Sequence, residues 1–176
     1  MGSLALTERA QRIKLLVLDV DGVLTDRRII LGSHGIQYKA FDVQDGFGLV
    51  LARKAGLKIA LITAERSQVV TRRARQLKVD WVAQFARDKA KAFVRCLAHF
   101  KVPASRVAWM GDDLLDLPIV TQAGLSASPD NACPDVKKRV HYVARAEGGR
   151  GAVRELVELI LRAQGRWGPL VKGFLK

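Results

Sequence analysis

Two carboxylates directly follow an apolar run near the start of this 176-residue chain. The run, residues 15–18 (LLVL), is long enough for one buried strand, and Asp19, Asp21 and Gly22 come next. Side chains alternate along extended backbone, so Asp19 and Asp21 can point the same way while Gly22 lets the chain turn. This geometry suits a divalent cation and a phosphate. A plain aspartate-rich turn, with Asp side chains bonded to nearby backbone N–H groups, has the same composition.

Polar side chains also follow two later apolar runs. Thr63 ends the predicted strand 57–63, and Asp112 and Asp113 follow the predicted strand 106–110. Lys89 lies in the first turn of a predicted helix, 87–100. Ligands of parallel α/β sheets bind beyond the carboxyl ends of the strands. We therefore expect these residues to meet Asp19 and Asp21 in one crevice.

The elements that must position these residues alternate between strands and helices. Further strands are predicted at 80–83, 124–128 and 141–144, and helices at 67–78 and 114–123, with others ending at Gly56 and following Gly151. Runs 28–31 and 36–41 around a glycine-bounded loop predict a β-hairpin, which we place as a flap beside the acidic tip. The pattern favours an α/β fold: a Rossmann-like, three-layer α/β/α arrangement with a mostly parallel sheet.

Converging carboxylates repel one another unless a cation neutralises them, which indicates a metal site. An all-oxygen ligand set that leaves room for waters and a phosphate favours Mg²⁺ over zinc. Phosphoryl transfer needs positive charge on the phosphate oxygens, which Mg²⁺, Lys89 and the Thr63 hydroxyl can supply, and a nucleophile, which Asp19 can supply. Asp21 would protonate the leaving alkoxide and later activate water.

Four motifs together resemble the haloacid dehalogenase superfamily of aspartate-dependent phosphohydrolases. They are DVDGVLT at 19–25, Thr63, Asp88-Lys89 and GDDLLD at 111–116. The resemblance implies Asp19 as nucleophile, Asp21 as acid/base, and Thr63 and Lys89 as phosphate binders. It also implies a metal site formed by Asp19, Asp112 and the backbone oxygen of Asp21, with Asp113 and Asp116 as supporting acids.

From about residue 13 to 164, the chain is similar to one branch, the 3-deoxy-D-manno-octulosonate 8-phosphate phosphatases. The similarity lies in FDVQDGFG at 41–48, GDDLLDLP at 111–118 and GGRGAVRE at 148–155. It implies a fold without a separate cap domain and a ring-like homotetramer in which a hairpin of one subunit closes the site of the next. Hairpin 28–41 is the candidate for that role.

The markers of substrate choice disagree. Glu65 follows the motif threonine at a place where the resemblance instead favours 2-keto-3-deoxynononate 9-phosphate phosphatases, whereas Arg150 favours the eight-carbon branch. We predict hydrolysis of a phosphorylated 2-keto-3-deoxy sugar acid, with the eight-carbon compound as best candidate. The candidate substrate-binding residues are Asp45, Gly46, Glu65, Arg66 and Arg150.

Composition bounds the alternatives. The formal net charge of +13 attracts anions, which keeps a nucleic-acid end phosphatase open, although little aromatic interleaving makes nucleic acid the weaker candidate. A catalytically silent oligomerisation module is a third reading. Two distant cysteines predict neither a disulfide framework nor a zinc site, and no apolar run is long enough to span a membrane, so a cytoplasmic protein is expected. Residues 1–12 are a predicted lead-in, 13–164 the phosphatase domain, and 165–176 a mobile tail.

Overall fold

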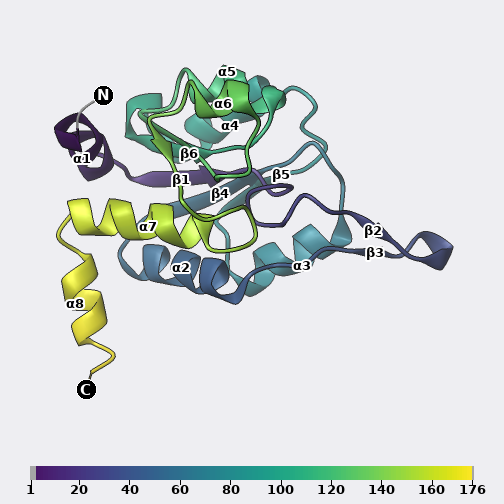
Figure 1. Cartoon of the computed structure of the whole chain (residues 1–176), viewed down its shortest axis with the longest axis horizontal. Coiled ribbons are helices and arrows are strands. Elements are labelled where there is room, and N and C mark those ends of the chain that lie inside the picture. The colour runs from purple at the N-terminus through teal and green to yellow at the C-terminus, as the bar shows by residue number, and fades with distance from the viewer. Residues whose placement is uncertain (1–2, 176) are drawn as a thin grey trace.

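Six strands pair in parallel to form the central sheet of the computed structural model, which describes residues 3–175 (Figure 1). The strand order is β5-β4-β1-β6-β7-β8. In that order the strands are Trp81–Ala83, Lys58–Ile62, Leu15–Leu18, Val107–Met110, Leu125–Ser128 and Tyr142–Val143. The prediction of a Rossmann-like α/β fold is confirmed, and every recorded pairing within this sheet is parallel.

The central strand β1 shows why helices cover both faces of the sheet. Leu16 and Leu18 belong to a core with helices α1 (Ser3–Gln11), α2 (Val43–Lys54), α3 (Gln68–Gln76) and α7 (Ala152–Ala163). Leu15 and Val17 belong to a second core with α4 (Lys89–Phe100), α5 (Leu117–Val120) and α6 (Pro134–Lys137). All four side chains are fully buried. The strand is apolar throughout because each face lies against helices.

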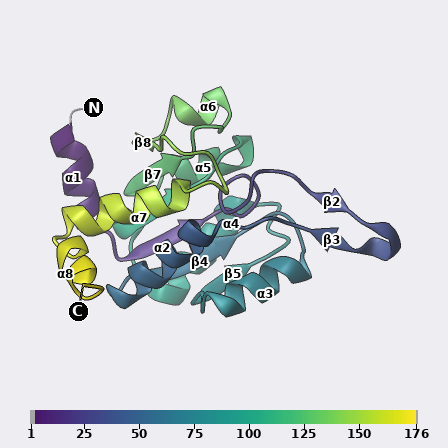
Figure 2. The same ribbon diagram turned by 60° about the horizontal axis from the view of Figure 1, so that its bottom comes forward.

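The predicted hairpin is present as β2 (Ile30–Leu31) and β3 (Gln37–Tyr38), joined through a 3-10 turn, Ser33–Gly35. Its strands are shorter than predicted. Figures 1 and 2 show the hairpin projecting away from the sheet and helices. Its base lies beside the acidic strand end, but its tip does not fold back over that site.

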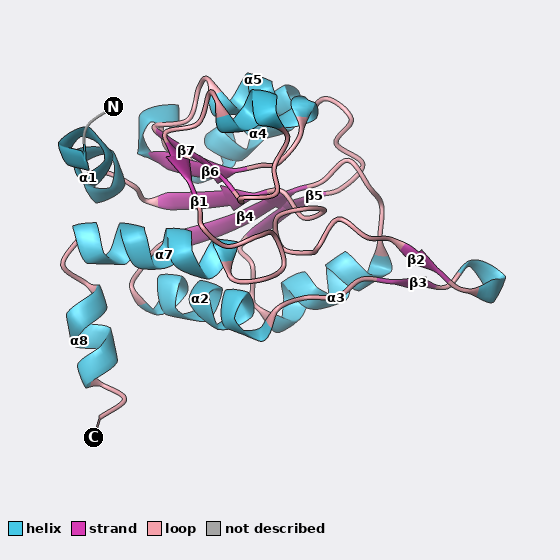
Figure 3. Cartoon of the chain, in the orientation of Figure 1, coloured by secondary structure: helices cyan, strands magenta, loops and turns pink. Residues whose placement is uncertain are grey.

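Loops gather at the carboxyl ends of β1, β4 and β6, on the side of the molecule from which the hairpin projects (Figure 3). The predicted helix 114–123 is wrong in detail: it is a 3-10 turn, Leu114–Asp116, followed by α5, which ends at Val120. Pro118 near the N-terminus of α5 is compatible with a helix start. Helix α6 lies between the segments predicted as strands 124–128 and 141–144.

The C-terminal segment that we predicted as a mobile tail contains a helix, α8 (Trp167–Lys172). Trp167 and Leu170 pack against the core that contains α2 and α7. The guanidinium groups of Arg154 and Arg162 each lie 5.1 Å from the Trp167 ring centroid. These contacts hold the tail at the end of the molecule opposite to the hairpin (Figure 1). Among the described residues, no helix is long and apolar enough to cross a membrane.

Candidate active site

Most of the residues predicted to do chemistry line one cavity of about 240 Å³ at the carboxyl ends of the strands. β1 leads into Asp19 and Asp21, β4 into Thr63, and β6 into Asp112. The predicted residues in its lining are Asp19, Asp21, Thr63, Glu65, Lys89, Asp112 and Asp113. The parallel sheet therefore brings together residues that are as many as 94 positions apart in the chain, which is the separation 113 − 19.

A glycine turn holds the two strand ends close together. Gly22 has a φ of +97°, and a Cβ at that position would overlap the carboxylate of Asp112. The N–H of Asp19 donates to the carbonyl of Met110 at 3.0 Å, which continues the β1–β6 ladder into the site. Only glycine suits both the backbone conformation and the close approach.

Lys89 connects two buried acids. The Asp88 side chain caps α4 by accepting from the N–H of Lys91 at 3.0 Å, which makes Lys89 the first residue of the helix. The Lys89 Nζ donates to Asp19 Oδ2 at 2.7 Å and to Asp116 Oδ1 at 2.6 Å. All three side chains of this network are buried, so the ammonium group is a fixed positive charge beside Asp19.

Burial dominates the protonation of the acids. Loss of solvent raises the pKa of Asp19 to about 8, against the opposing effect of Lys89. Burial, together with the charge of Asp116, raises the pKa of Asp112 to about 7. Burial lowers the pKa of Lys89, but Asp19 and Asp116 outweigh it and the net shift is upward. The site therefore strongly favours additional positive charge near Asp19 and Asp112.

A metal ion fits this donor set. Asp19, Asp112 and Asp116 are buried, and each offers a carboxylate oxygen within 4.8 Å of the others. Asp116 is already committed, because its Oδ1 accepts from Lys89 and its Oδ2 accepts from the N–H groups of Asp112 and Asp113. Asp19 and Asp112 are thus the carboxylates that could hold a hard cation such as Mg²⁺.

The chain is similar in sequence and in fold to known proteins. Residues 58–156 match the family model of haloacid dehalogenase-like hydrolases. The 3-deoxy-D-manno-octulosonate 8-phosphate phosphatase of Yersinia pestis is 41% identical over 89% of this chain and 84% of its own length. The chain belongs to the haloacid dehalogenase-like hydrolase family. The predicted family and enzyme class, a phosphoric monoester hydrolase, are confirmed.

Solved structures of this hydrolase family agree with the fold. The Moraxella catarrhalis 3-deoxy-D-manno-octulosonate 8-phosphate phosphatase, in complex with magnesium ion, phosphate ion and a KDO molecule, has a TM-score of 0.96 and 39% identity. The alignment covers 98% of this chain and 99% of that one. A cobalt-bound Haemophilus influenzae relative has a TM-score of 0.91 and 33% identity, covering 96% of this chain and 99% of that one.

Two residues of this hydrolase that sequence reasoning missed contact the site. Lys39, from the base of the hairpin, forms a close ion pair with Asp21, and its side chain is fully buried. Arg27 lines the cavity and donates to the carbonyl of Asn131 at 2.6 Å. Side chains alternate along the predicted strand 36–41, so the sequence could have placed Lys39 and Tyr38 on opposite faces of the hairpin. Nothing in the pattern says which side faces the acids.

Other predicted substrate residues lie elsewhere. Asp45 is buried, and its carboxylate accepts from the N–H groups of Gly151 at 3.1 Å and Arg154 at 2.8 Å, so it fastens α2 to the start of α7. Gly46 lies beside it, where a Cβ would overlap the guanidinium of Arg73. Arg150 lines a neighbouring hollow with Asp26, Asp42 and Gln44 rather than the acidic cavity, and Arg66 is exposed outside the residues that line that cavity.

Proposed function

We propose that this chain is a Mg²⁺-dependent phosphatase of a phosphorylated 2-keto-3-deoxy sugar acid, with 3-deoxy-D-manno-octulosonate 8-phosphate as the preferred substrate. The observation that carries the proposal is the buried Asp19 carboxylate, which shares its cavity with Lys89 and Asp112. The named activity of the Yersinia relative and the bound magnesium, phosphate and KDO of the Moraxella neighbour support the substrate and the metal.

The reaction begins with attack of an Asp19 oxygen on phosphorus, which breaks the ester bond and leaves an aspartyl-phosphate. Asp21 donates a proton to the leaving alkoxide and then takes one from water, which hydrolyses the aspartyl-phosphate and frees inorganic phosphate. The Lys89 ammonium and the Thr63 hydroxyl bind phosphate oxygens. Asp19 and Asp112 would hold Mg²⁺, which would supply the remaining positive charge that the transferring phosphoryl group needs.

Lys39 helps to hold the Asp21 carboxyl group in place for these steps. Its ammonium pairs with Asp21 Oδ1, while the Thr63 hydroxyl lies 3.4 Å from Asp21 Oδ2. These partners fix the orientation of the acid/base carboxyl group. Because Lys39 comes from the hairpin, the position of the hairpin base and the position of the general acid are linked.

The nine-carbon 2-keto-3-deoxynononate 9-phosphate remains the second candidate because Glu65 lines the cavity. A carboxylate there can accept hydrogen bonds from additional sugar hydroxyls. The ratio of kcat/KM values for the eight- and nine-carbon compounds assigns the substrate, and a preference for the nine-carbon compound replaces the first candidate with the second.

Replacing Asp19 by Asn tests the mechanism. Asparagine keeps the size of the side chain but removes the nucleophilic carboxylate, so kcat for the sugar acid phosphate should fall by about 10⁴-fold or more. Circular dichroism and thermal unfolding should report an intact fold. Activity of the variant within a few-fold of wild type would remove Asp19 as the nucleophile.

We also propose a homotetramer in the cytoplasm. The hairpin exposes Ile29, Ile30, Leu31, Ile36 and Tyr38, an apolar group that a partner subunit could cover. Contact of that hairpin with the site of a neighbouring subunit would exclude water from the phosphoenzyme. The free cysteines Cys96 and Cys133 support a reducing compartment.

A further inference from the structure

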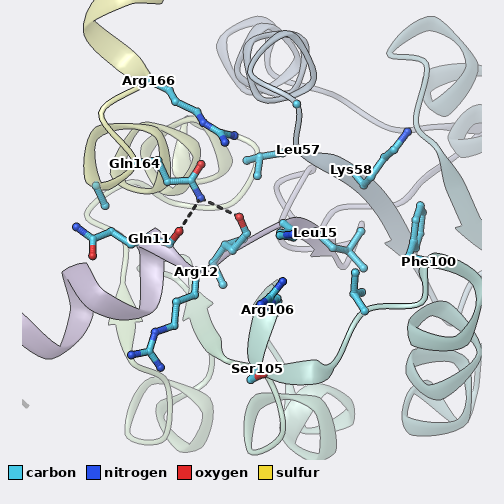
Figure 4. Close-up of a pocket in the computed structure, with 15 residues that line it drawn as sticks. Gln11, Arg12, Leu15, Leu57, Lys58, Phe100, Ser105, Arg106, Gln164 and Arg166 are labelled. Carbon is cyan, nitrogen blue, oxygen red and sulfur yellow. Dashed lines mark hydrogen bonds between the residues drawn. The ribbon is translucent and has the colours of Figure 1, made fainter.

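A second and larger cavity lies at the amino ends of the strands, opposite to the end that carries the catalytic acids. It has a volume of about 1210 Å³ and opens where β1, β4 and β6 begin, between the end of α1, the end of α4 and the segment after α7 (Figure 4). Its lining carries five cationic side chains and, among the described residues that line it, no acidic one. The cations are Arg12, Lys14, Lys58, Arg106 and Arg166.

The register of the sheet brings two of these cations side by side and a third close to them. The N–H of Lys14 donates to the carbonyl of Arg106 at 2.9 Å, and the N–H of Lys58 donates to the carbonyl of Lys14 at 3.0 Å. Lys14 and Arg106 are therefore direct neighbours at the start of adjacent strands, whereas Lys58 pairs in register with Leu15, one residue further along β1. Like charges side by side on a sheet are unfavourable unless a counter-charge is present.

Protein groups satisfy only part of this charge. Lys58 pairs with Asp80 at 3.0 Å, and Arg166 donates to the carbonyl of Ala55 at 2.8 Å. For Lys14 and Arg106, no side-chain hydrogen bond or ion pair is recorded within the described part of the chain. These side chains are exposed at the cavity, so an anion can reach them from solvent.

Hydrogen bonds and apolar side chains fix the walls of the cavity between the cations. The amide of Gln164 donates to the carbonyls of Ala10 at 3.2 Å, Gln11 at 3.5 Å and Ile13 at 2.8 Å, which ties the end of α7 to the lead into β1. Figure 4 draws the bonds to Gln11 and Ile13. Leu57 and the half-buried Phe100 add apolar surface to the lining. The cavity therefore combines a fixed frame, an apolar wall and a surplus of positive charge.

We propose that this cavity binds a small molecule carrying several phosphate groups, such as a nucleoside triphosphate. A chain of phosphates supplies three or more negative charges within one cavity, which matches the clustered cations, whereas one phosphate monoester would leave most of them unbalanced. The base of a nucleoside can lie on the apolar wall at Phe100. The cations surround a concavity instead of following a stripe, which favours a compact polyanion over a nucleic-acid strand.

Titration calorimetry on the full chain tests the proposal with two probes, inorganic tripolyphosphate and ATP. The buffer holds about 0.15 M salt, which screens weak surface attraction, and no divalent cation. Both probes should bind wild type, and the double variant Lys14→Ala/Arg106→Ala should bind them about tenfold or more weakly. The matched control is Arg72→Ala/Arg75→Ala on the exposed face of α3, which removes the same charge and should change affinity by less than about twofold.

The two probes also separate the sources of affinity. Equal binding of tripolyphosphate and ATP assigns recognition to the phosphates alone, and tighter binding of ATP adds the apolar wall; both support the proposal. Absence of binding by either probe overturns it, as does an equal loss in both double variants, which would show diffuse attraction to net charge. A DNA oligonucleotide that binds more tightly than either probe and depends on Lys14 and Arg106 would replace it with a nucleic-acid site.

Discussion

Asp116 shows how one buried carboxylate organises others. Its two oxygens accept from the Lys89 ammonium and from the N–H groups of Asp112 and Asp113. The side chain is fully buried, so these donors replace water completely. Asp116 thus fixes both the lysine beside Asp19 and the backbone that carries Asp112. It acts on the site through other residues, which fits the supporting role predicted for it.

Asp45 is a second buried acid, and its titration should make stability depend on pH. Burial raises its pKa to about 6 from the ordinary value of 3.8, although backbone N–H groups of Arg154 and Gly151 oppose the shift. Between these two values the unfolded chain has lost the proton while the folded chain keeps it. The contribution of Asp45 to the free energy of unfolding should therefore fall as pH rises through this window, by at most about 3 kcal/mol.

Urea unfolding of wild type and Asp45→Asn at several values from about pH 4 to about pH 7 isolates this contribution. Asp19 and Asp112 titrate in both proteins, so their effect cancels when the two free energies are subtracted. The wild-type advantage should shrink as pH rises through the window and then level off. A difference that stays constant across this range would mean that Asp45 titrates at its ordinary value.

At the scale of elements, the strands and their carboxyl ends could be predicted because buried parallel strands are short apolar runs with polar residues directly behind them. Local sequence could not show that Lys39 reaches Asp21, because that contact depends on how the hairpin base packs. It also did not indicate α8, because the glycines of the tail at positions 165, 168 and 173 suggested a mobile segment. The packing of Trp167 against α7 overrides that local tendency.

The turn after β1 offers an element-scale prediction. Gly22→Ala adds a Cβ that meets Asp112 and also strains a backbone at φ +97°. Gly165→Ala at φ +68° imposes the backbone strain alone, because nothing lies within 4 Å of its Cβ. Each substitution should cost about 1–3 kcal/mol in strain. Only Gly22→Ala should also displace Asp112 and lower kcat, by about tenfold or more.

Unfolding free energies and phosphatase kinetics on the two alanine variants separate strain from displacement. We expect the two variants to lose comparable stability. Only Gly22→Ala should also lose activity. Full activity of Gly22→Ala would show that the turn moves without disturbing Asp112.

At the scale of the whole molecule, the sheet separates the two candidate sites along the strand direction. The proposed catalytic residues lie at the carboxyl ends of β1, β4 and β6, and the basic cavity lies where the same strands begin. The hairpin projects from the first end and α8 packs at the other (Figure 1). An assembly that uses the hairpin would therefore cover the catalytic end and leave the basic cavity open to solvent.

Leu31→Glu tests whether the hairpin forms that assembly. Leu31 is 78% exposed in the single chain, so a charged side chain there should leave the fold of each subunit unchanged. Burying the charge in a subunit interface would be costly, so the variant should sediment as a smaller species than wild type and lose activity. Val94→Glu, at a 59% exposed position on α4, is the control and should keep the wild-type mass and activity. If wild type, Leu31→Glu and Val94→Glu sediment alike, the hairpin does not hold subunits together, and its contribution to catalysis is confined to Lys39 in its own chain.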